Sequence, residues 1–479
     1  MKPKIRRAPL ALLFLFVLVL GGCAVGPDYQ RPQVAVPAHY KELPGWARAE
    51  PAAAAPKGPW WVVFQDPLLN QLEPQVAVSN QTVAQNYANY QAALAEIKVA
   101  RSALFPTLGV SGSTSRQRSS GALSTSAQNS GSLEGSVSWA PDLWGGVRRS
   151  IEANKANAQA SQATLANATL SEQLALAEAV IELRVTDANI DLLQKTVEAY
   201  RESLRVVSNQ DKAGTVPPSD VISARAQLEN AQSNLIALGV ARAQYAHAIA
   251  VLVGKNPEAL SLPHDATLPP LPQVPVGVPS TLLQRRPDIA IAERQMAAQN
   301  ADIGVAEAAY YPNLSLSAVD GFMQSPLAGL LNIANHVWSL GADVGLTLFD
   351  GGERHGQVLA AKARYEAAVA NYRGTVLAAF KNVEDDLSGL RIREQQAVVL
   401  DGAVRDATRA TEIARNEYAA GTVDFTAVSV AQATQLNNEQ TALNVREQRL
   451  LGAVSLIGDL GGGWSASDMT LASDAPPAR

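Results

Sequence analysis

The side chains that most often carry out enzymatic chemistry are few and scattered in this sequence. Asp385 and Asp386 could act as a general acid and base, but they lie in a long predicted helix and are typical of a solvated surface. The glycine pairs at 145–146 and 351–352 lack the G-x-G-x-x-G spacing of a nucleotide-binding loop and better fit strand-to-helix turns. Five histidines show no metal-ligand spacing: His39, His247, His264, His336 and His355. We therefore expect a protein that is not an enzyme, with no metal and no cofactor.

The only cysteine, Cys23, lies in a context that predicts a different chemistry. A basic N-terminus is followed by a short apolar run, Leu10–Leu20, and then by two glycines directly before Cys23. This run is shorter than the roughly 20 residues of a transmembrane helix and is typical of a signal peptide covering 1–22. The pattern resembles the bacterial lipoprotein box, which implies a lipidated Cys23 at the mature N-terminus. In that family an Asp after the cysteine retains the protein at the inner membrane, so Ala24 implies the outer membrane. A plain secretory signal with an unrelated cysteine is the less favoured alternative.

The composition excludes several classes of protein. The chain has 479 residues, a net charge of −5, 17% charged residues, 5% aromatic residues and 47% hydrophobic residues. A single cysteine rules out an intrachain disulfide, and the mild acidity argues against a nucleic-acid partner. The hydrophobic content is ample for a large core, so the chain is not intrinsically disordered. Low charge with few aromatics favours long alanine-rich helices and strands rich in Ser, Thr and Gly.

The sequence contains an internal duplication with an offset of about 206 residues. Three matches in the same order define it: 96–106 with 302–312, 143–148 with 349–354, and 213–216 with 420–423. We place the first copy at 69–254 and the second at 280–460, joined by a proline-rich linker at 255–279. An N-terminal segment, 23–68, and a C-terminal tail, 461–479, flank the two copies.

Each copy predicts the element order helix, strand, strand, helix, helix. The expected elements of the first copy are a helix at 69–104, a β-hairpin at 105–143, and helices at 145–211 and 217–253. Those of the second copy are a helix at 280–309, a β-hairpin at 311–349, and helices at 351–419 and 425–458.

The expected strands alternate apolar residues with small or polar ones. The clearest cases are 338–348 in the second copy and 132–139 in the first. This pattern suits an outer-membrane barrel, although an ordinary half-buried sheet of a soluble domain shows it too. Because the smallest such barrels need about eight strands, several chains must pool theirs. No later run of 18 or more apolar residues predicts a transmembrane helix.

The helix expected after the first hairpin carries two apolar stripes about 180° apart. Leu174, Ile181 and Leu192 belong to one stripe, and Leu183 and Ile190 to the other. A helix in the wall of a ring contacts a neighbour on each side, so this pattern favours a hollow helical barrel. An elongated coiled-coil bundle is the alternative, and it would place the stripes on adjacent faces.

Four motifs together resemble the TolC/OprM family of outer-membrane efflux channels, in its NodT-like lipoprotein branch. They lie at Gly26–Pro32, Trp60–Leu68, Arg286–Ile289 and Phe349–Gly352. The resemblance implies an α+β fold, TolC-like and duplicated, in which a homotrimer completes a transmembrane β-barrel and a long α-helical periplasmic barrel. It also implies partners: outer-membrane lipids, a periplasmic adaptor protein and an inner-membrane efflux pump of a Gram-negative bacterium. The function it implies is a passive exit duct for drugs or other small toxic solutes. A lipid-anchored periplasmic helical scaffold without a pore is the alternative.

The same resemblance implies which residues form the periplasmic end. Gly214 and Thr215 in one helix–helix turn, and Gly421 and Thr422 in the other, match adaptor-contact turns, although positive φ alone would also explain glycine there. The residues that we expect at the closed aperture are Asp220, Tyr418 and Asp424. The chain departs from the family pattern at Val423 and Val430, where an Arg and an Asp are usual, and we expect Asp424 to supply a substitute carboxylate.

Overall fold

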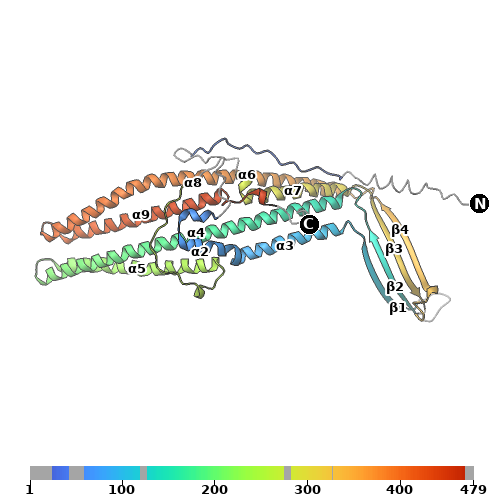
Figure 1. The fold of residues 1–479 in the computed structure, drawn as a ribbon, viewed down its shortest axis with the longest axis horizontal. Coiled ribbons are helices and arrows are strands. Elements are labelled where there is room, and N and C mark those ends of the chain that lie inside the picture. The colour runs from blue at the N-terminus through green and yellow to red at the C-terminus, as the bar shows by residue number, and fades with distance from the viewer. Residues whose placement is uncertain (1–23, 43–58, 119–126, 275–281, 326, 470–479) are drawn as a thin grey trace, which may run out of the picture. The chain divides into compact units, whose positions relative to one another are not determined.

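The computed structural model describes residues 24–42, 59–118, 127–274, 282–325 and 327–469 (Figure 1). The chain divides into two compact units. Among the described residues, the strand unit comprises those within 24–33, 90–161 and 291–373, and the helical unit comprises those within 34–89, 162–290 and 374–469. Both units contain segments of both sequence copies.

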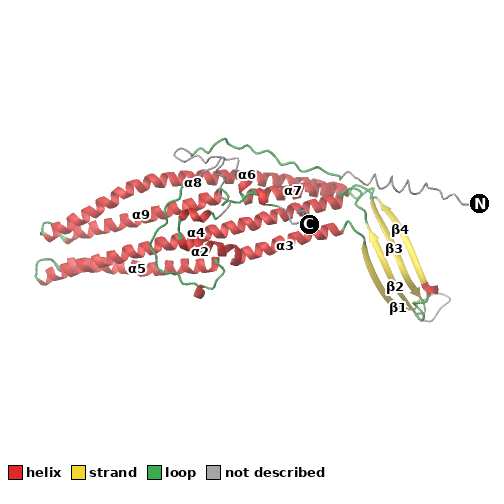
Figure 2. Ribbon diagram, viewed as in Figure 1, coloured by secondary structure: helices red, strands yellow, loops and turns green. Residues whose placement is uncertain are grey.

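The strand unit contains one antiparallel sheet with the order β1-β2-β3-β4 (Figure 2). Its strands are β1 (Thr107–Gln117), β2 (Gln128–Trp139), β3 (Asn313–Gln324) and β4 (His336–Gly345). They lie inside the two hairpins expected from the sequence. The central β2–β3 pair joins the two copies.

The strand register separates two chemically different faces of the sheet. Leu108 is opposite Val137, Val137 is opposite Ala318, and Ala318 is opposite Leu340, so an apolar row crosses all four strands. The neighbouring row holds Thr107, Ser138, Ser317 and Gly341. Because directly opposite residues point to the same side of a sheet, one face is apolar and the other small and polar at this level. The alternation read from the sequence is therefore present in the sheet.

The helices repeat in length between the copies. The helices α4 (Gly146–Lys212) and α8 (Glu353–Ala419) have 67 residues each, and α5 (Pro218–Leu252) and α9 (Phe425–Asp459) have 35 each. The helices before the hairpins, α3 (Gln81–Ser102) and α7 (Pro287–Ala308), have 22 residues each. These equal lengths support the duplication inferred from the sequence motifs.

The first helix of each copy is interrupted, which corrects the expectation of one continuous helix at 69–104 and another at 280–309. In the first copy α2 (Pro67–Ser79) ends before Asn80. The Oδ1 atom of Asn80 accepts hydrogen bonds from the backbone N–H groups of Thr82 (2.8 Å) and Val83 (3.1 Å). Asn80 therefore caps the N-terminus of α3, because a side-chain oxygen satisfies N–H groups that have no partner within the helix.

In the second copy the break lies at the equivalent place, between α6 (Leu282–Arg285) and α7. Pro287 is the first residue of α7, and proline disfavours a helical conformation of the residue before it, here Arg286. The two breaks are built alike, since Asn80 donates to the carbonyl of Leu252 (3.0 Å) and Arg286 donates to the carbonyl of Asp459 (2.9 Å). Each side chain therefore ties the break to the last helix of its own copy.

Among the described residues, α5 is the one helix that is long and apolar enough to cross a membrane by length and composition alone. One side of α5 packs on α4 through Leu228 and Ala231, which contact Val197 and Tyr200. Its apolar residues Ile222, Ile236, Val240 and Val251 are exposed in the single chain. The helix also carries Arg242, which is paired with a buried aspartate of α4. This helix differs from the expectation from the sequence that no later segment would be apolar enough to span a membrane, and its hydropathy comes from two apolar faces, one packed on α4 and one exposed.

Candidate functional site

The two helix–helix turns of the helical unit have the same geometry. Gly214 has φ of +69°, and Gly421 has φ of +73°. The backbone N–H and the hydroxyl of Thr215 both donate to the carbonyl of Gln210 (2.9 Å each), as those of Thr422 do to the carbonyl of Glu417 (3.0 and 2.9 Å). Glycine at positive φ and threonine therefore cap the C-termini of α4 and α8. All four predicted contact residues are exposed at these turns.

The ends of four helices meet next to these turns. Val207 of α4, Ala224 of α5, Ala414 of α8, and Phe425 and Val428 of α9 form one buried cluster. A cavity of about 420 Å³ lies beside it, lined by residues of α4, α8 and α9. The cluster brings the turn of the first copy next to the turn of the second.

Tyr418 connects the two copies at this cluster. Its ring packs against Phe425 with the ring centroids 5.8 Å apart, and its hydroxyl donates to Oε1 of Gln210. Partial burial raises the pKa of Tyr418, and the negative charge of Asp220 raises it further. Asp220 itself lies in the first turn of α5, where a negative charge is favourable.

Asp424 has a local structural role in the described chain. It is the N-cap of α9, and its Oδ1 accepts a hydrogen bond from the backbone N–H of Ala427 (3.2 Å). The structure thus brings Tyr418 and Asp220 together, while Asp424 remains exposed at the start of the next helix.

Two further contacts near the turns were not expected from the sequence. The hydroxyl of Ser429 donates to Oε1 of Gln227 (3.0 Å), which links α9 to α5. The amide of Gln432 donates to the hydroxyl of Ser203 (3.2 Å), which links α9 to α4. Glutamine and serine are common on helix surfaces, and the partners are about 200 positions apart, so a single sequence gives no signal for these pairs. Val430, the position of the missing family Asp, is exposed.

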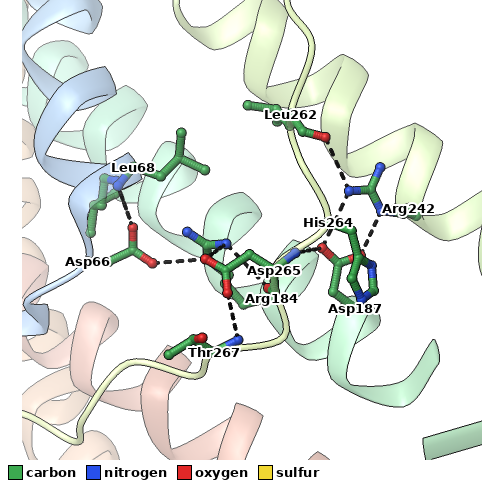
Figure 3. A network of polar contacts seen from close by, with 10 residues as sticks. Asp66, Leu68, Arg184, Asp187, Arg242, Leu262, His264, Asp265 and Thr267 are labelled. Atoms are coloured by element: carbon green, nitrogen blue, oxygen red, sulfur yellow. Dashed lines mark hydrogen bonds and ion pairs between the residues drawn. The ribbon is translucent and has the colours of Figure 1, made fainter. Parts of the chain in front are cut away.

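The helical unit also contains a larger polar network that was not predicted from the sequence (Figure 3). It begins at Asp66, the N-cap of α2, whose Oδ1 accepts from the N–H groups of Leu68 (2.7 Å) and Leu69 (3.0 Å). Its Oδ2 pairs with Nε of the buried Arg184 on α4 (3.1 Å). Trp60 and Phe64 of the same motif are buried. The Trp60–Leu68 motif therefore anchors the start of α2 to α4.

The network continues to the linker between the copies. Arg184 also pairs with Asp265 of the linker, and the backbone N–H of Thr267 hydrogen-bonds to the Asp265 carboxyl and lowers its pKa, with Arg184 adding to the effect. Asp187 is fully buried and accepts from Nε of Arg242 on α5 (2.6 Å) and from the backbone N–H of Asp265 (2.9 Å). The linker is thus fixed to α4 and α5 by ion pairs and hydrogen bonds (Figure 3).

The second copy contains a weaker form of the same arrangement. Glu394 and Arg449, which lie 207 positions after Asp187 and Arg242, approach within 3.8 Å. Arg391, at the position equivalent to Arg184, pairs with Glu42 of the N-terminal segment. The duplication therefore includes an ion pair between the two long helices of each copy.

In the strand unit, the segment that follows Cys23 is bound to the start of α4. Cys23 itself lies outside the described residues. The backbone N–H of Val25 donates to the carbonyl of Trp144 (3.0 Å). The guanidinium of Arg149 donates to the carbonyls of Val25 (3.1 Å) and Gly26 (3.0 Å) and to Oδ1 of Asp28 (2.9 Å). Arg149 therefore fixes the chain within a few residues of the predicted lipid site.

Glycines permit this close approach. A Cβ on Gly26, where φ is +97°, would lie 2.4 Å from the Cα of Gly304 on α7. A Cβ on Gly145 would lie 2.7 Å from the Cα of Ala24. The carbonyl of Pro27 also accepts from the amide of Asn300 (2.9 Å). The Gly26–Pro32 motif is thus explained by packing and hydrogen bonding of the N-terminal segment.

The sequence model of the family described as "Outer membrane efflux protein" matches residues 72–255 and 278–462. The chain belongs to this family. The two matched ranges cover nearly the whole of both predicted copies, so the resemblance drawn from the motifs is confirmed.

Individual members of the outer membrane efflux protein family match over almost the full chain. The probable efflux pump outer membrane protein TtgC of Pseudomonas putida is 30% identical over 465 residues, covering 94% of this chain and 95% of that protein. The outer membrane protein OprJ of Pseudomonas aeruginosa is 27% identical, again covering 94% of this chain and 95% of that protein. The outer-membrane channel OprN has a solved structure with a TM-score of 0.85 and 29% identity, covering 92% of this chain and 100% of that one.

Membership of the outer membrane efflux protein family tests several of the predictions made from the sequence. The TolC-like α+β fold is confirmed, as is the outer membrane as the location and efflux as the class of transport. These relatives give no support to a periplasmic scaffold without a pore. These relatives are transport proteins. Lipidation of Cys23 and the roles of the residues at the turns stay predictions.

Proposed function

We propose that this chain forms a homotrimeric outer-membrane channel, the exit duct for drugs or other small toxic solutes. An inner-membrane pump would supply the solutes and the energy through a periplasmic adaptor. Relatives named as antibiotic and toluene efflux pump outer membrane proteins support this substrate class.

The observation that carries the proposal is the incomplete sheet. Its apolar row is open to the surroundings, with Leu108 77% and Leu340 76% exposed. The two edge strands β1 and β4 pair only inward within the described chain. Four strands are too few to close a membrane barrel, whereas several copies joined edge to edge would satisfy the edges and turn the apolar face to lipid. The exposed apolar residues of α5 and α8 support contacts with further copies in the same way.

The turns suit a role at the periplasmic end. We assign adaptor contact to Gly214, Thr215, Gly421 and Thr422, because they are exposed and the two turns have the same hydrogen bonds and backbone geometry. We assign closure of the aperture to Tyr418, Asp220 and Asp424. The Tyr418–Gln210 hydrogen bond supports this assignment, since it joins the two copies where the turns meet.

Planar-bilayer recording of the purified full-length protein tests the channel and its aperture together. We expect stepwise conductance for the wild type, whereas a scaffold would give none. Tyr418→Phe removes the hydroxyl that binds Gln210. The loss of this hydrogen bond should destabilise the closed state relative to the open state by about 0.5–1.5 kcal/mol. The open probability should therefore rise up to about tenfold.

Two controls separate the aperture from general damage. Tyr365→Phe removes a hydroxyl from the same helix far along the chain from the turn and should leave conductance unchanged. Asp424→Ser keeps an N-cap for α9 while removing the carboxylate, so a change in conductance would report the charge itself. Conductance that is identical in the wild type, Tyr418→Phe and Asp424→Ser would remove Tyr418 and Asp424 from the aperture assignment but leave the channel intact.

We also propose that Cys23 carries the lipid anchor. Cys23→Ser should abolish lipidation, measured by mass spectrometry, yet keep much of the protein in the outer-membrane fraction because the sheet holds it there independently. Complete transfer of the variant to the soluble periplasm would contradict a membrane-spanning sheet. A wild-type mass without lipid would contradict the anchor.

A further inference from the structure

The two copies within the chain already show how one copy joins another in the sheet. The strands β1 and β4 lie at the edges, and β2 and β3 join the copies at the centre (Figure 1). The strand β2 is the last of the first copy, and β3 is the first of the second copy. In a ring of several chains, β4 meets β1 of the next chain as β2 meets β3 within one chain. The β2–β3 pair therefore predicts the register between chains.

The strand registers define which residues of the two copies are equivalent. Each β1 residue corresponds to the β3 residue 206 positions later, as in the motifs directly before the two hairpins. Leu108 is opposite Val137 in the first copy, and its counterpart Leu314 is opposite Val344 in the second. Val137 and Val344 are therefore equivalent, and each β2 residue corresponds to the residue 207 positions later.

The register of the β2–β3 pair can now be transferred to the sheet edges. Trp139, the last residue of β2, is opposite Leu316 of β3. Their counterparts are Leu346, which directly follows β4, and Val110 of β1. The same register between chains therefore places Leu346 opposite Val110 and lengthens β4 by one residue.

The two faces of the sheet support this register independently. Val110 is on the apolar face, two residues after Leu108, and Leu346 continues the alternate apolar positions of β4 that include Leu340. Both Val110 and Leu346 are exposed in the single chain. A shift by one residue would place Leu346 opposite a residue of the polar face, such as Ser111, and interrupt the apolar face between chains.

The connections between strands and helices also indicate another chain as the partner. Within the chain, the connection after β2 packs on the one before β3. The ring of Trp144 stacks on Tyr311 with the centroids 4.8 Å apart, and its Nε1 donates to the carbonyl of Pro312 (2.7 Å). The connection after β4 instead exposes 88% of Phe349, and the one before β1 exposes 67% of Phe105. Pairing of β4 with β1 of a second chain would bring these two aromatic side chains together and bury them.

We infer that both sheet edges bind further copies of this chain in the register of the β2–β3 pair. The strand β4 of one chain runs antiparallel to β1 of the next, with Leu346 opposite Val110 on the apolar face. On the polar face, the adjacent pair is Gly345 and Ser111. The inference rests on the proposed channel and adds the residue pairing that closes its barrel.

Cysteine pairs in the full-length protein test this register after oxidation of isolated outer membranes. Leu346→Cys combined with Val110→Cys should give covalent multimers up to a trimer on non-reducing gels, because opposite Cβ atoms lie about 4.5–5.5 Å apart. Gly345→Cys with Ser111→Cys is the second variant, and a Cβ on Gly345 meets nothing within 4 Å. Hydrogen-bonded and non-hydrogen-bonded pairs alternate along antiparallel strands, so the two variants sample both geometries.

Three controls accompany these variants. Trp139→Cys with Leu316→Cys is the equivalent pair within one chain and should form an internal disulfide in a protein of monomer mass. Leu346→Cys with Thr114→Cys moves one thiol four residues along β1, about 14 Å, and should give no covalent multimer. Each cysteine substituted alone should also give none, which excludes disulfides with the native Cys23.

The outcomes distinguish the register from the channel itself. Multimers from the Thr114→Cys combination but from neither predicted pair would overturn the register. If neither predicted pair gave multimers while the reduced variants conducted in planar bilayers, pairing of β4 with β1 would be overturned and the channel would stand. Multimers from the predicted pairs in a protein that does not conduct would support the register and contradict the channel.

Discussion

Gly254→Ala is expected to lower the stability of the folded protein much more than Gly421→Ala. Both glycines have positive φ, +68° and +73°, where any other residue costs about 1–3 kcal/mol. Their surroundings differ. A Cβ on Gly254 would lie 2.1 Å from the carbonyl oxygen of Ser79, whereas a Cβ on Gly421 meets nothing within 4 Å. The alanine at 254 must displace backbone at the break between α2 and α3, which adds about 1–3 kcal/mol.

The duplication provides an independent repeat of this experiment. Gly461 has φ of +99°, and its Cβ would lie 2.1 Å from the carbonyl oxygen of Arg285, at the break before α7. Gly461→Ala should therefore behave like Gly254→Ala. Thermal unfolding midpoints in detergent and the yield of folded protein measure both effects, with Gly421→Ala as the control for φ alone. Equal midpoints for all three variants would show that the close approach at the breaks is not required.

Glu73→Gln is expected to stabilise the protein, and more so as pH rises. Glu73 is fully buried on α2, and neither carboxyl oxygen has a hydrogen-bond partner among the described residues. Burial raises the pKa of Glu73 from 4.5 to about 9. The folded state therefore keeps the proton at pH values at which the unfolded state has lost it.

The sign and size of this effect follow from proton linkage. Between pH 4.5 and 9 the unfolded chain binds fewer protons at Glu73, so the free energy of unfolding falls as pH rises. At pH 7 the penalty is about 3 kcal/mol, from 1.36 kcal/mol per pH unit above the ordinary pKa. Glutamine has nearly the same shape and does not ionise, so it removes this penalty.

Thermal unfolding midpoints measured from pH 5 to pH 9 test the prediction. The advantage of Glu73→Gln over the wild type should be small at pH 5 and largest near pH 9. Glu96→Gln, at an exposed position on α3, is the matched control and should show no such trend. An advantage of the same size at every pH would mean that ionisation of Glu73 is not its cause.

Features with a local cause were predictable from the sequence. The turns at Gly214 and Gly421 depend on glycine and threonine within a few residues of a helix end, and the strands depend on a two-residue alternation. The duplication was visible because three local motifs repeat at nearly one offset. These signals were sufficient for the element order, and the motifs together identified the family.

Features that depend on distant partners were not predictable. In the sequence, Asn80 lies in what looks like the middle of one helix. Its side-chain amide donates a hydrogen bond to the carbonyl of Leu252, and this partner is far along the chain. Asp66 was recognised only as part of a motif, and its partner Arg184 lies 118 positions away. His264 was grouped with scattered histidines, since nothing in the sequence places it between Asp187 and Asp191. Long-range ion pairs need the fold before their partners can be known.

Because α4 and α8 have equal lengths, their ends lie at matching positions, and a change in the length of one helix would disturb its contacts with the other copy. Each additional residue moves a helix end by about 1.5 Å and rotates it by about 100°. A single deletion in α4 alone would turn Gln210 away from Tyr418 and separate the cluster around Val207 and Phe425. A deletion of the same size in α8 would be needed to restore the match. We therefore expect the contacts between the two helix–helix turns to survive an insertion or deletion in one of these 67-residue helices only when the other helix changes by the same number of residues.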